Sequence, residues 1–197
     1  ADKVSINTAA IQRPELIKEA SRRFGSSTIV ISIEAIRKSD GCYEAYTDNG
    51  REKTGLDVFE WASRVVDLGA GEIMITSIDQ EGTGKGFDLG LTRKVSGSVP
   101  IPVIACGGAG KPAHIRDVIT EGKADAVSMA SILHYNFVKQ CIPEGDFSSE
   151  GNTEYLRNKR TFSKIQDTTI TEIKEYLTQN GLECRYSVSR AVHDQVD

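Results

Sequence analysis

Short apolar, β-branched runs alternate with amphipathic stretches along most of the chain, and this alternation limits the possible fold more than any other feature. Apolar residues at helical spacing follow most of the runs, so strands and helices alternate. This order predicts a parallel sheet with right-handed crossover helices, which is an α/β fold. Strands are expected at residues 3–6, 28–34, 72–76, 101–105 and 125–130, and helices at 14–24, 57–68, from about 88, at 112–121 and at 170–180.

Residues 41–50 interrupt this alternation. Their sequence, GCYEAYTDNG, contains the pair Asn49-Gly50, which favours the tight turn of a β-hairpin. We therefore expect a small surface hairpin between the second strand and the second helix.

Composition narrows the class of protein. The 197 residues carry a formal net charge of −4, which argues against a general nucleic-acid binder. No apolar run approaches the roughly 18 residues that a membrane span needs, and no signal peptide is expected before the first strand. The four cysteines are scattered without a CxxC pair, so we expect reduced thiols, a cytoplasmic protein and no metal site.

The expected carboxyl ends of several strands carry glycines and small residues. In parallel α/β folds the active site lies at these ends. The backbone N–H groups of glycines can approach a phosphate closely, and the N-terminus of a following helix favours an anion. One phosphate site is therefore predicted, with tight turns alone as the alternative, and its residues would be Gly82, Gly107, Gly108, Ala130 and Ser131.

Two other strand ends carry polar groups. Asn7 and Thr8 follow the first strand and could bind a second anion, although Thr8 could equally cap the next helix. Glu34 ends an otherwise apolar strand, where burial would raise the pKa of its carboxyl and suit it for acid–base catalysis. A salt bridge from Glu34 to Arg37 or Lys38 is the alternative.

Two charged residues stand at the opposite, amino ends of their strands. Lys3 begins the first strand and Glu72 begins the third, so both would face the same mouth of a barrel. A buried pair of this kind is hard to justify by stability alone. It indicates a gate or an interface, and two solvated surface charges are the alternative.

Several segments resemble one known family in order and spacing. The segments DKVSINTAA, EWASRVVDLGAGEIMITSIDQEGT, PVIACGGAGK, ADAVSMASILHY and ITEIKEYLTQNGLECR resemble the cyclase subunit of imidazole glycerol phosphate synthase. The resemblance implies a (βα)8 TIM-barrel type of fold, no cofactor, and a lyase of histidine biosynthesis. That enzyme joins ammonia to phosphoribulosyl-formimino-aminoimidazole carboxamide ribonucleotide, giving imidazole glycerol phosphate and aminoimidazole carboxamide ribonucleotide. A glutaminase subunit, bound as a heterodimer at the bottom of the barrel, would supply the ammonia.

The resemblance also assigns roles by position. It places Glu34 where the family has a catalytic aspartate, and Asp2, Lys3 and Glu72 at the ammonia entrance and the glutaminase interface. Phosphate or substrate binding is expected from a larger set, drawn from the strand ends and the resemblance together: Asn7, Thr8, Thr76, Glu81, Gly82, Gly107, Gly108, Ala130 and Ser131.

The chain also departs from the family. Glu34 extends one methylene further than the family's aspartate, and residues 136–167 are expected to be an insertion after the last strand. Residues 1–135 would hold strands four to eight with their helices, about five of the eight βα units. Residues 168–184 would form the last barrel helix and 185–197 a polar tail. A missing amino-terminal part, in the same or another chain, would then be needed for catalysis.

Two other functions stay open. A cyclase-like subunit could instead deliver ammonia for sugar amidation in surface polysaccharide synthesis, although the end of this chain resembles the histidine-pathway proteins. The related aminoimidazole carboxamide ribonucleotide isomerase is a weaker fit, because the Lys3 and Glu72 pair and the SIDQEGT loop match the cyclase better.

Overall fold

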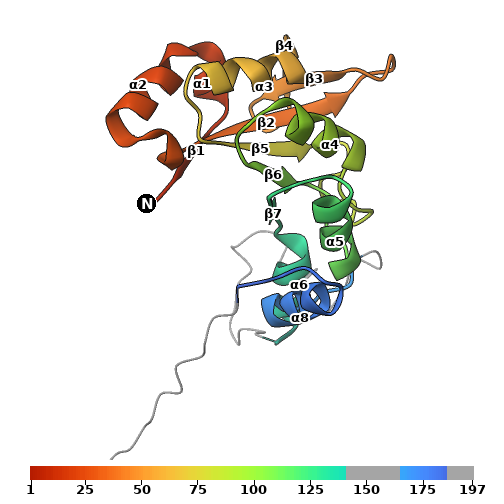
Figure 1. The fold of residues 1–197 in the computed structure, drawn as a ribbon. Helices are drawn as coiled ribbons and strands as arrows, with labels where there is room; N and C mark the ends of the chain where they lie inside the picture. Colours follow the sequence, from red (N-terminus) through yellow and green to blue (C-terminus); the bar gives the residue numbers. More distant parts are fainter. Residues whose placement is uncertain (141–164, 186–197) are drawn as a thin grey trace, which may run out of the picture.

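The chain forms a sheet whose central strands all run parallel. The computed structural model describes residues 1–140 and 165–185 and orders the strands β4-β3-β2-β5-β6-β7, with β1 also paired to β2 (Figure 1). This confirms the predicted α/β class with a parallel sheet. The parallel strands are β1 (Val4–Ile6), β2 (Ile29–Arg37), β5 (Glu72–Ser77), β6 (Val103–Cys106) and β7 (Ala126–Ser128).

Helices connect these strands and have well-defined starts. Asp57 caps α3 by accepting hydrogen bonds from two backbone N–H groups, Asp88 caps α4, and Thr169 forms a capping box with Glu172 at the start of α8. The helices are α1 (Thr8–Gln12), α2 (Glu15–Phe24), the 3₁₀ turn η1 (Ser26–Thr28), α3 (Val58–Asp67), α4 (Leu89–Ser98), α5 (Pro112–Thr120), α6 (Ser131–Gln140) and α8 (Ile170–Gln179).

The two faces of the sheet differ in character. Alternate residues of a strand point to opposite faces. On one face Ile31, Ile33, Ile73 and Ile75 are buried and pack in a core with helix residues such as Trp61. On the other face β2 and β5 present a more polar set, composed of Val30, Ser32, Glu34, Glu72, Met74 and Thr76.

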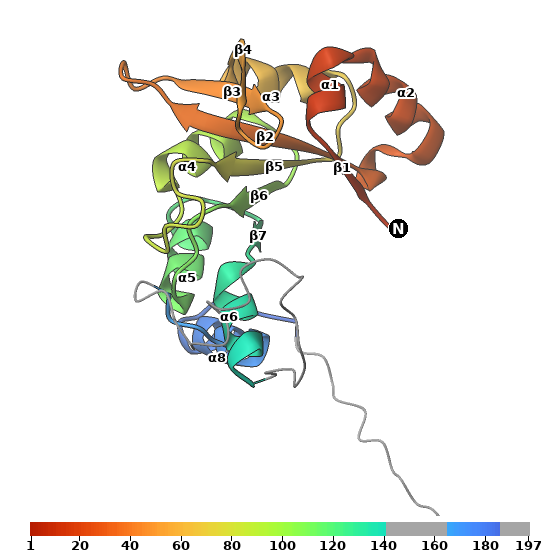
Figure 2. The same cartoon turned by 180° about the vertical axis from the view of Figure 1, so that it is seen from behind.

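Within the described residues the sheet curves without closing into a barrel. β1 pairs with β2 and β7 pairs with β6, and neither has a second partner in residues 1–140 and 165–185. Figure 2 shows the strands following one another from β2 through β5 and β6 to β7. β1 and β7 therefore each present a free edge.

The hairpin contributes more to the fold than its sequence indicates. Its turn lies where predicted, since Asn49 and Gly50 both have positive φ. However, β3 (Tyr43–Thr47) pairs with the second half of β2, and β4 (Glu52–Asp57) pairs with β3. Tyr43 packs edge-on against Phe59 of α3, so the hairpin is an integral part of the sheet and not a surface feature.

The expected insertion from residue 136 begins as a helix. α6 continues to Gln140, so residues 136–140 are helical. Residues 141–164, which make up most of the expected insertion, and all but the first residue of the expected tail lie outside the described residues.

Candidate functional site

Polar side chains form a row across the carboxyl ends of the parallel strands. The register pairs Glu34 of β2 with Thr76 of β5, Thr76 with Cys106 of β6, and Cys106 with Ser128 of β7. Paired residues of neighbouring parallel strands point to the same face, which here is the face away from the helices. Sequence reasoning predicted Glu34 and Thr76 but missed Cys106 and Ser128, although both stand at strand ends.

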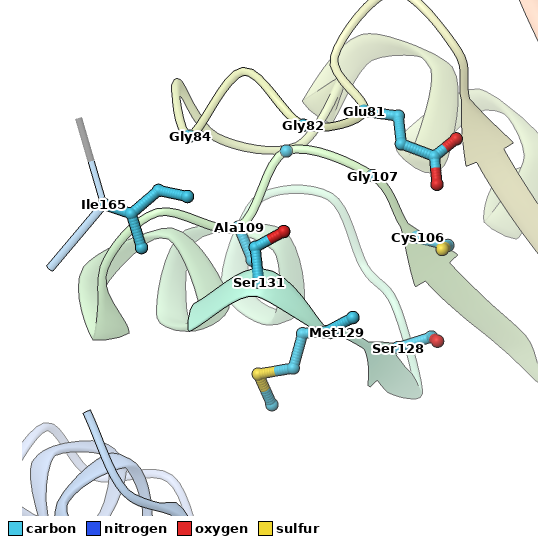
Figure 3. A pocket seen from close by; sticks show the side chains of 12 residues that line it. Glu81, Gly82, Gly84, Cys106, Gly107, Ala109, Ser128, Met129, Ser131 and Ile165 are labelled. Carbon is cyan, nitrogen blue, oxygen red and sulfur yellow. The ribbon is translucent and has the colours of Figure 1, made fainter. Parts of the chain in front are cut away.

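A pocket of about 120 Å³ opens beside this row, between two glycine-rich loops and the start of α6 (Figure 3). One loop follows β5 and the other follows β6. The pocket brings together residues from three consecutive strand ends, as the sequence predicts. The predicted residues that line it are Glu81, Gly82, Gly107, Gly108, Ala130 and Ser131.

The two loops touch so closely that side chains would not fit between them. The Gly86 N–H donates a hydrogen bond of 2.7 Å to the Gly108 carbonyl. A Cβ atom on Gly108 would lie 2.1 Å from the Gly86 oxygen, and one on Gly110 would lie 2.1 Å from the Gly84 oxygen. Gly108 also has a φ of 104°, in the region that favours glycine. The glycines therefore form turns and also leave the backbone bare at the pocket.

Glu34 lies half-buried at the end of the row nearest the hairpin. Its Oε2 accepts a hydrogen bond of 2.7 Å from the Gly50 N–H. Burial raises the pKa of the Glu34 carboxyl, the bond from Gly50 opposes this rise, and the negative charges of Glu81 and Asp48 add to it. A raised pKa is what acid–base chemistry near neutral pH requires.

The alternative salt bridge of Glu34 is not found. Lys38 instead pairs with Asp40 at 3.7 Å. The Arg37 backbone N–H donates to Asp79 Oδ2 at 2.8 Å, which ties the end of β2 to the loop after β5.

Asn7 and Thr8 hold β1 against its neighbours. Asn7 Nδ2 donates to the carbonyls of Ser32 at 3.0 Å and Tyr46 at 3.2 Å. Thr8 Oγ1 donates to Asn7 Oδ1 at 3.1 Å and accepts from the Asp48 N–H at 3.2 Å. The capping alternative for Thr8 was wrong, because Asn7 is the N-cap of α1 and Thr8 is its first helical residue. Neither residue lines the pocket.

The opposite, amino ends of the strands hold the other predicted group. Lys3 Nζ and Glu72 Oε1 form an ion pair, in which the Lys3 side chain is 49% exposed and the Glu72 side chain 17% exposed. The pair is therefore neither fully buried nor two free surface charges. Asp2 lines an adjoining groove of about 420 Å³ together with Val4 and Phe24.

Comparison with known proteins identifies the family of this chain. The model of a family described as histidine biosynthesis protein matches residues 1–139. The chain belongs to the histidine biosynthesis protein family. One member, the imidazole glycerol phosphate synthase subunit HisF of Alkaliphilus metalliredigens (strain QYMF), is 50% identical over 153 residues, which are 75% of this chain. The match covers 61% of that protein, so the chain spans about three fifths of the length of this curated relative.

No helix in the described ranges is long and apolar enough to cross a membrane. Three cysteines in these ranges, Cys42, Cys106 and Cys184, are free thiols. Cys141 lies outside the described residues.

Proposed function

We propose that the chain supplies strands four to eight of the cyclase subunit of imidazole glycerol phosphate synthase, a cytoplasmic lyase of histidine biosynthesis. The enzyme would join ammonia to phosphoribulosyl-formimino-aminoimidazole carboxamide ribonucleotide, giving imidazole glycerol phosphate and aminoimidazole carboxamide ribonucleotide. The observation that carries the proposal is the strand-end pocket of two glycine loops and a helix start, beside the row that contains Glu34. The 50% identity to HisF supports the same reaction.

The pocket would bind a phosphate of this substrate. Gly82 and Gly108 line it and carry no side chains, so their backbone can approach a bound anion closely. α6 begins at Ser131, and the positive end of its dipole faces the pocket. Thr76 and Glu81 lie beside these groups and would contact the polar part of the substrate.

A second phosphate would lie near Asn7 and Thr8. Binding there requires the Thr8 hydroxyl to turn from Asn7 Oδ1 toward the ligand, because the Asn7 amide already bonds two carbonyls.

Glu34 would move a proton during ring closure. Its neutral carboxyl can donate a proton to a departing nitrogen, and its carboxylate can accept one from the attacking nitrogen. The Gly50 N–H holds Oε2, which leaves Oε1 as the oxygen for the substrate. The pKa of Glu34, raised by burial, keeps both protonation states accessible closer to neutral pH.

The Lys3 and Glu72 pair would form the ammonia entrance at the other mouth, with Asp2 at the surface that meets a glutaminase subunit. The pair lies at the opposite strand ends from the pocket, so ammonia entering there would travel along the polar face of the sheet. The remaining barrel strands would come from the same or another chain and would pair with the free edges of β1 and β7.

Cyclase turnover with ammonium salts tests the proposal. The chain would be assayed alone and together with the part of HisF outside the match, using the histidine-pathway ribonucleotide as substrate. We expect phosphate binding by the chain alone but turnover only in the reconstituted protein. Glu34→Gln should lower that turnover by about 10²- to 10⁴-fold, whereas Glu34→Asp, which restores the family's residue, should retain it.

Two outcomes would argue against parts of this proposal. Turnover by the isolated chain would show that no further strands are needed. A reconstituted protein that binds phosphate yet forms no imidazole glycerol phosphate would favour ammonia delivery for sugar amidation.

A further inference from the structure

Two backbone hydrogen bonds hold the segment that leads into α8 beside the proposed phosphate pocket. The Gln166 N–H donates a hydrogen bond of 2.7 Å to the Gly110 carbonyl, which belongs to the loop after β6. The Thr168 N–H donates to the Ile132 carbonyl at 3.2 Å, in the first turn of α6. These two bonds tie the segment to two of the three elements that form the pocket.

The far end of this segment is anchored as well. Thr168 is only 5% exposed, and its hydroxyl donates to Glu172 Oε2 at 2.7 Å. Glu172 also accepts from the Thr169 N–H within the capping box of α8. The backbone of residues 166–169 is therefore fixed at both ends, so the position of the preceding residue is set by the fold.

That preceding residue, Ile165, lines the pocket. Figure 3 shows its side chain at the outer side of the pocket, across from Ser131 and close to the loop that carries Ala109. The rest of the lining is glycine backbone and small side chains, together with Glu81, Cys106 and Met129. Ile165 is thus a branched apolar side chain in a pocket that also presents glycine backbone and the start of α6.

We propose that Ile165 is an affinity- and specificity-determining residue of this pocket, where it excludes water from one side of a bound phosphate monoester. The inference rests on the proposed phosphate-binding function and adds a residue to it. Hydrogen bonds and dipoles act more strongly on an anion when water is kept away. An apolar side chain supplies that effect without competing for hydrogen bonds to the phosphate oxygens. It also leaves no room beside the phosphate for a further polar group of the ligand.

Titration of the full chain with inorganic phosphate tests the role of Ile165. Ile165→Ala should weaken binding by about tenfold, the usual size of one lost apolar contact in a binding pocket. Ile165→Asp should weaken it by at least about 100-fold, because a carboxylate would face the phosphate across a few ångströms. Ile165→Leu keeps an apolar wall and should bind within about threefold of the unmodified chain.

Matched changes at Ile170 provide the control. Ile170 is the first residue of α8, is 48% exposed and does not line the pocket. Ile170→Ala and Ile170→Asp should bind phosphate as the unmodified chain does. Thermal unfolding of every variant would show whether each one is folded.

The outcomes separate this inference from the proposed function. Weak binding by folded Ile165→Ala and Ile165→Asp, with normal binding by Ile165→Leu and the Ile170 variants, supports it. Equal binding by all folded variants overturns the role of Ile165 and leaves the phosphate site intact. No phosphate binding by the unmodified chain overturns the phosphate site and this inference with it.

Discussion

The carboxyl of Glu34 ionises less readily in the folded chain than in water, because burial raises its pKa and the bond from Gly50 only partly offsets the rise. Between the ordinary pKa of about 4.3 and the higher folded value, the folded state holds more protons than the unfolded state. Stability therefore falls as pH rises through this window, and it stays lower above it. The property that would serve catalysis thus costs the fold stability at neutral pH.

Glu34→Gln should remove this cost. The variant is expected to melt at a higher temperature than the unmodified chain at pH 7, since a glutamine oxygen can still accept from Gly50. The gap should narrow as pH falls through about 4.3 and close well below that value, where the glutamate is protonated in both states. Glu175→Gln on the exposed face of α8 serves as the control. A gap that persists unchanged at low pH would contradict the explanation by burial.

The interlocked glycine loops make a second prediction at single residues. Gly108→Ala should destabilise the chain by at least about 1–3 kcal/mol, the cost of a strained backbone, because its Cβ would overlap the Gly86 oxygen. Phosphate binding should be lost with it. Gly97→Ala is the matched control: apart from its chain neighbours and the backbone of α4 itself, no atom lies within 4 Å of the added carbon, so a gain of about 0.5–1 kcal/mol is expected. Urea unfolding compares the two, and equal stabilities would refute the close-packing argument.

Elements with a strong local pattern could be predicted from sequence, and those that depend on distant partners could not. The strand from Ile29 and the helix from Ile170 carry clear periodicity and clear ends, and both lie where expected. β4 was missed because residues 52–57 are mostly polar, show no regular apolar alternation and become a strand by pairing with β3. For the site, the rule that active sites of parallel α/β folds lie at the carboxyl ends of the strands led to most of the residues that line the pocket. It could not show that Asn7 is engaged by two carbonyls or that Ile165 reaches the pocket, since both depend on contacts between distant segments.

The start of α3 provides a prediction at the scale of one element. Asp57 Oδ1 accepts from the N–H groups of Phe59 and Glu60, so Asp57→Ala should cost about 1 kcal/mol of unfolding free energy. Asp67 lies at the other end of the same helix and is exposed, where a negative charge meets the negative end of the dipole. Asp67→Ala should therefore cause no loss. Chemical denaturation measures both, and a larger loss from Asp67→Ala would show that the side-chain cap does not govern this helix.

On the scale of the whole molecule, the described chain is a curved sheet with helices on one face and a polar row on the other. β1 and β7 have free edges, and Val4 on β1 is 47% exposed. Unpaired edges of this kind invite pairing with another segment. The matched relative is longer than this chain, and it has residues outside the match that could fill the gap.

The part of HisF outside the match should therefore bind this chain and pair with both free edges. Mixing the two polypeptides should give a one-to-one complex by analytical ultracentrifugation and raise the melting temperature, because the free edges of β1 and β7 become paired. Amide exchange offers the sharper readout. The N–H groups of Val4–Ile6 that point away from β2 should exchange freely in the chain alone and become protected in the complex, whereas those of β5, already between two strands, should change little. A complex that forms without protecting β1 would place the partner elsewhere and would argue against the proposal that the chain is an open segment of a barrel.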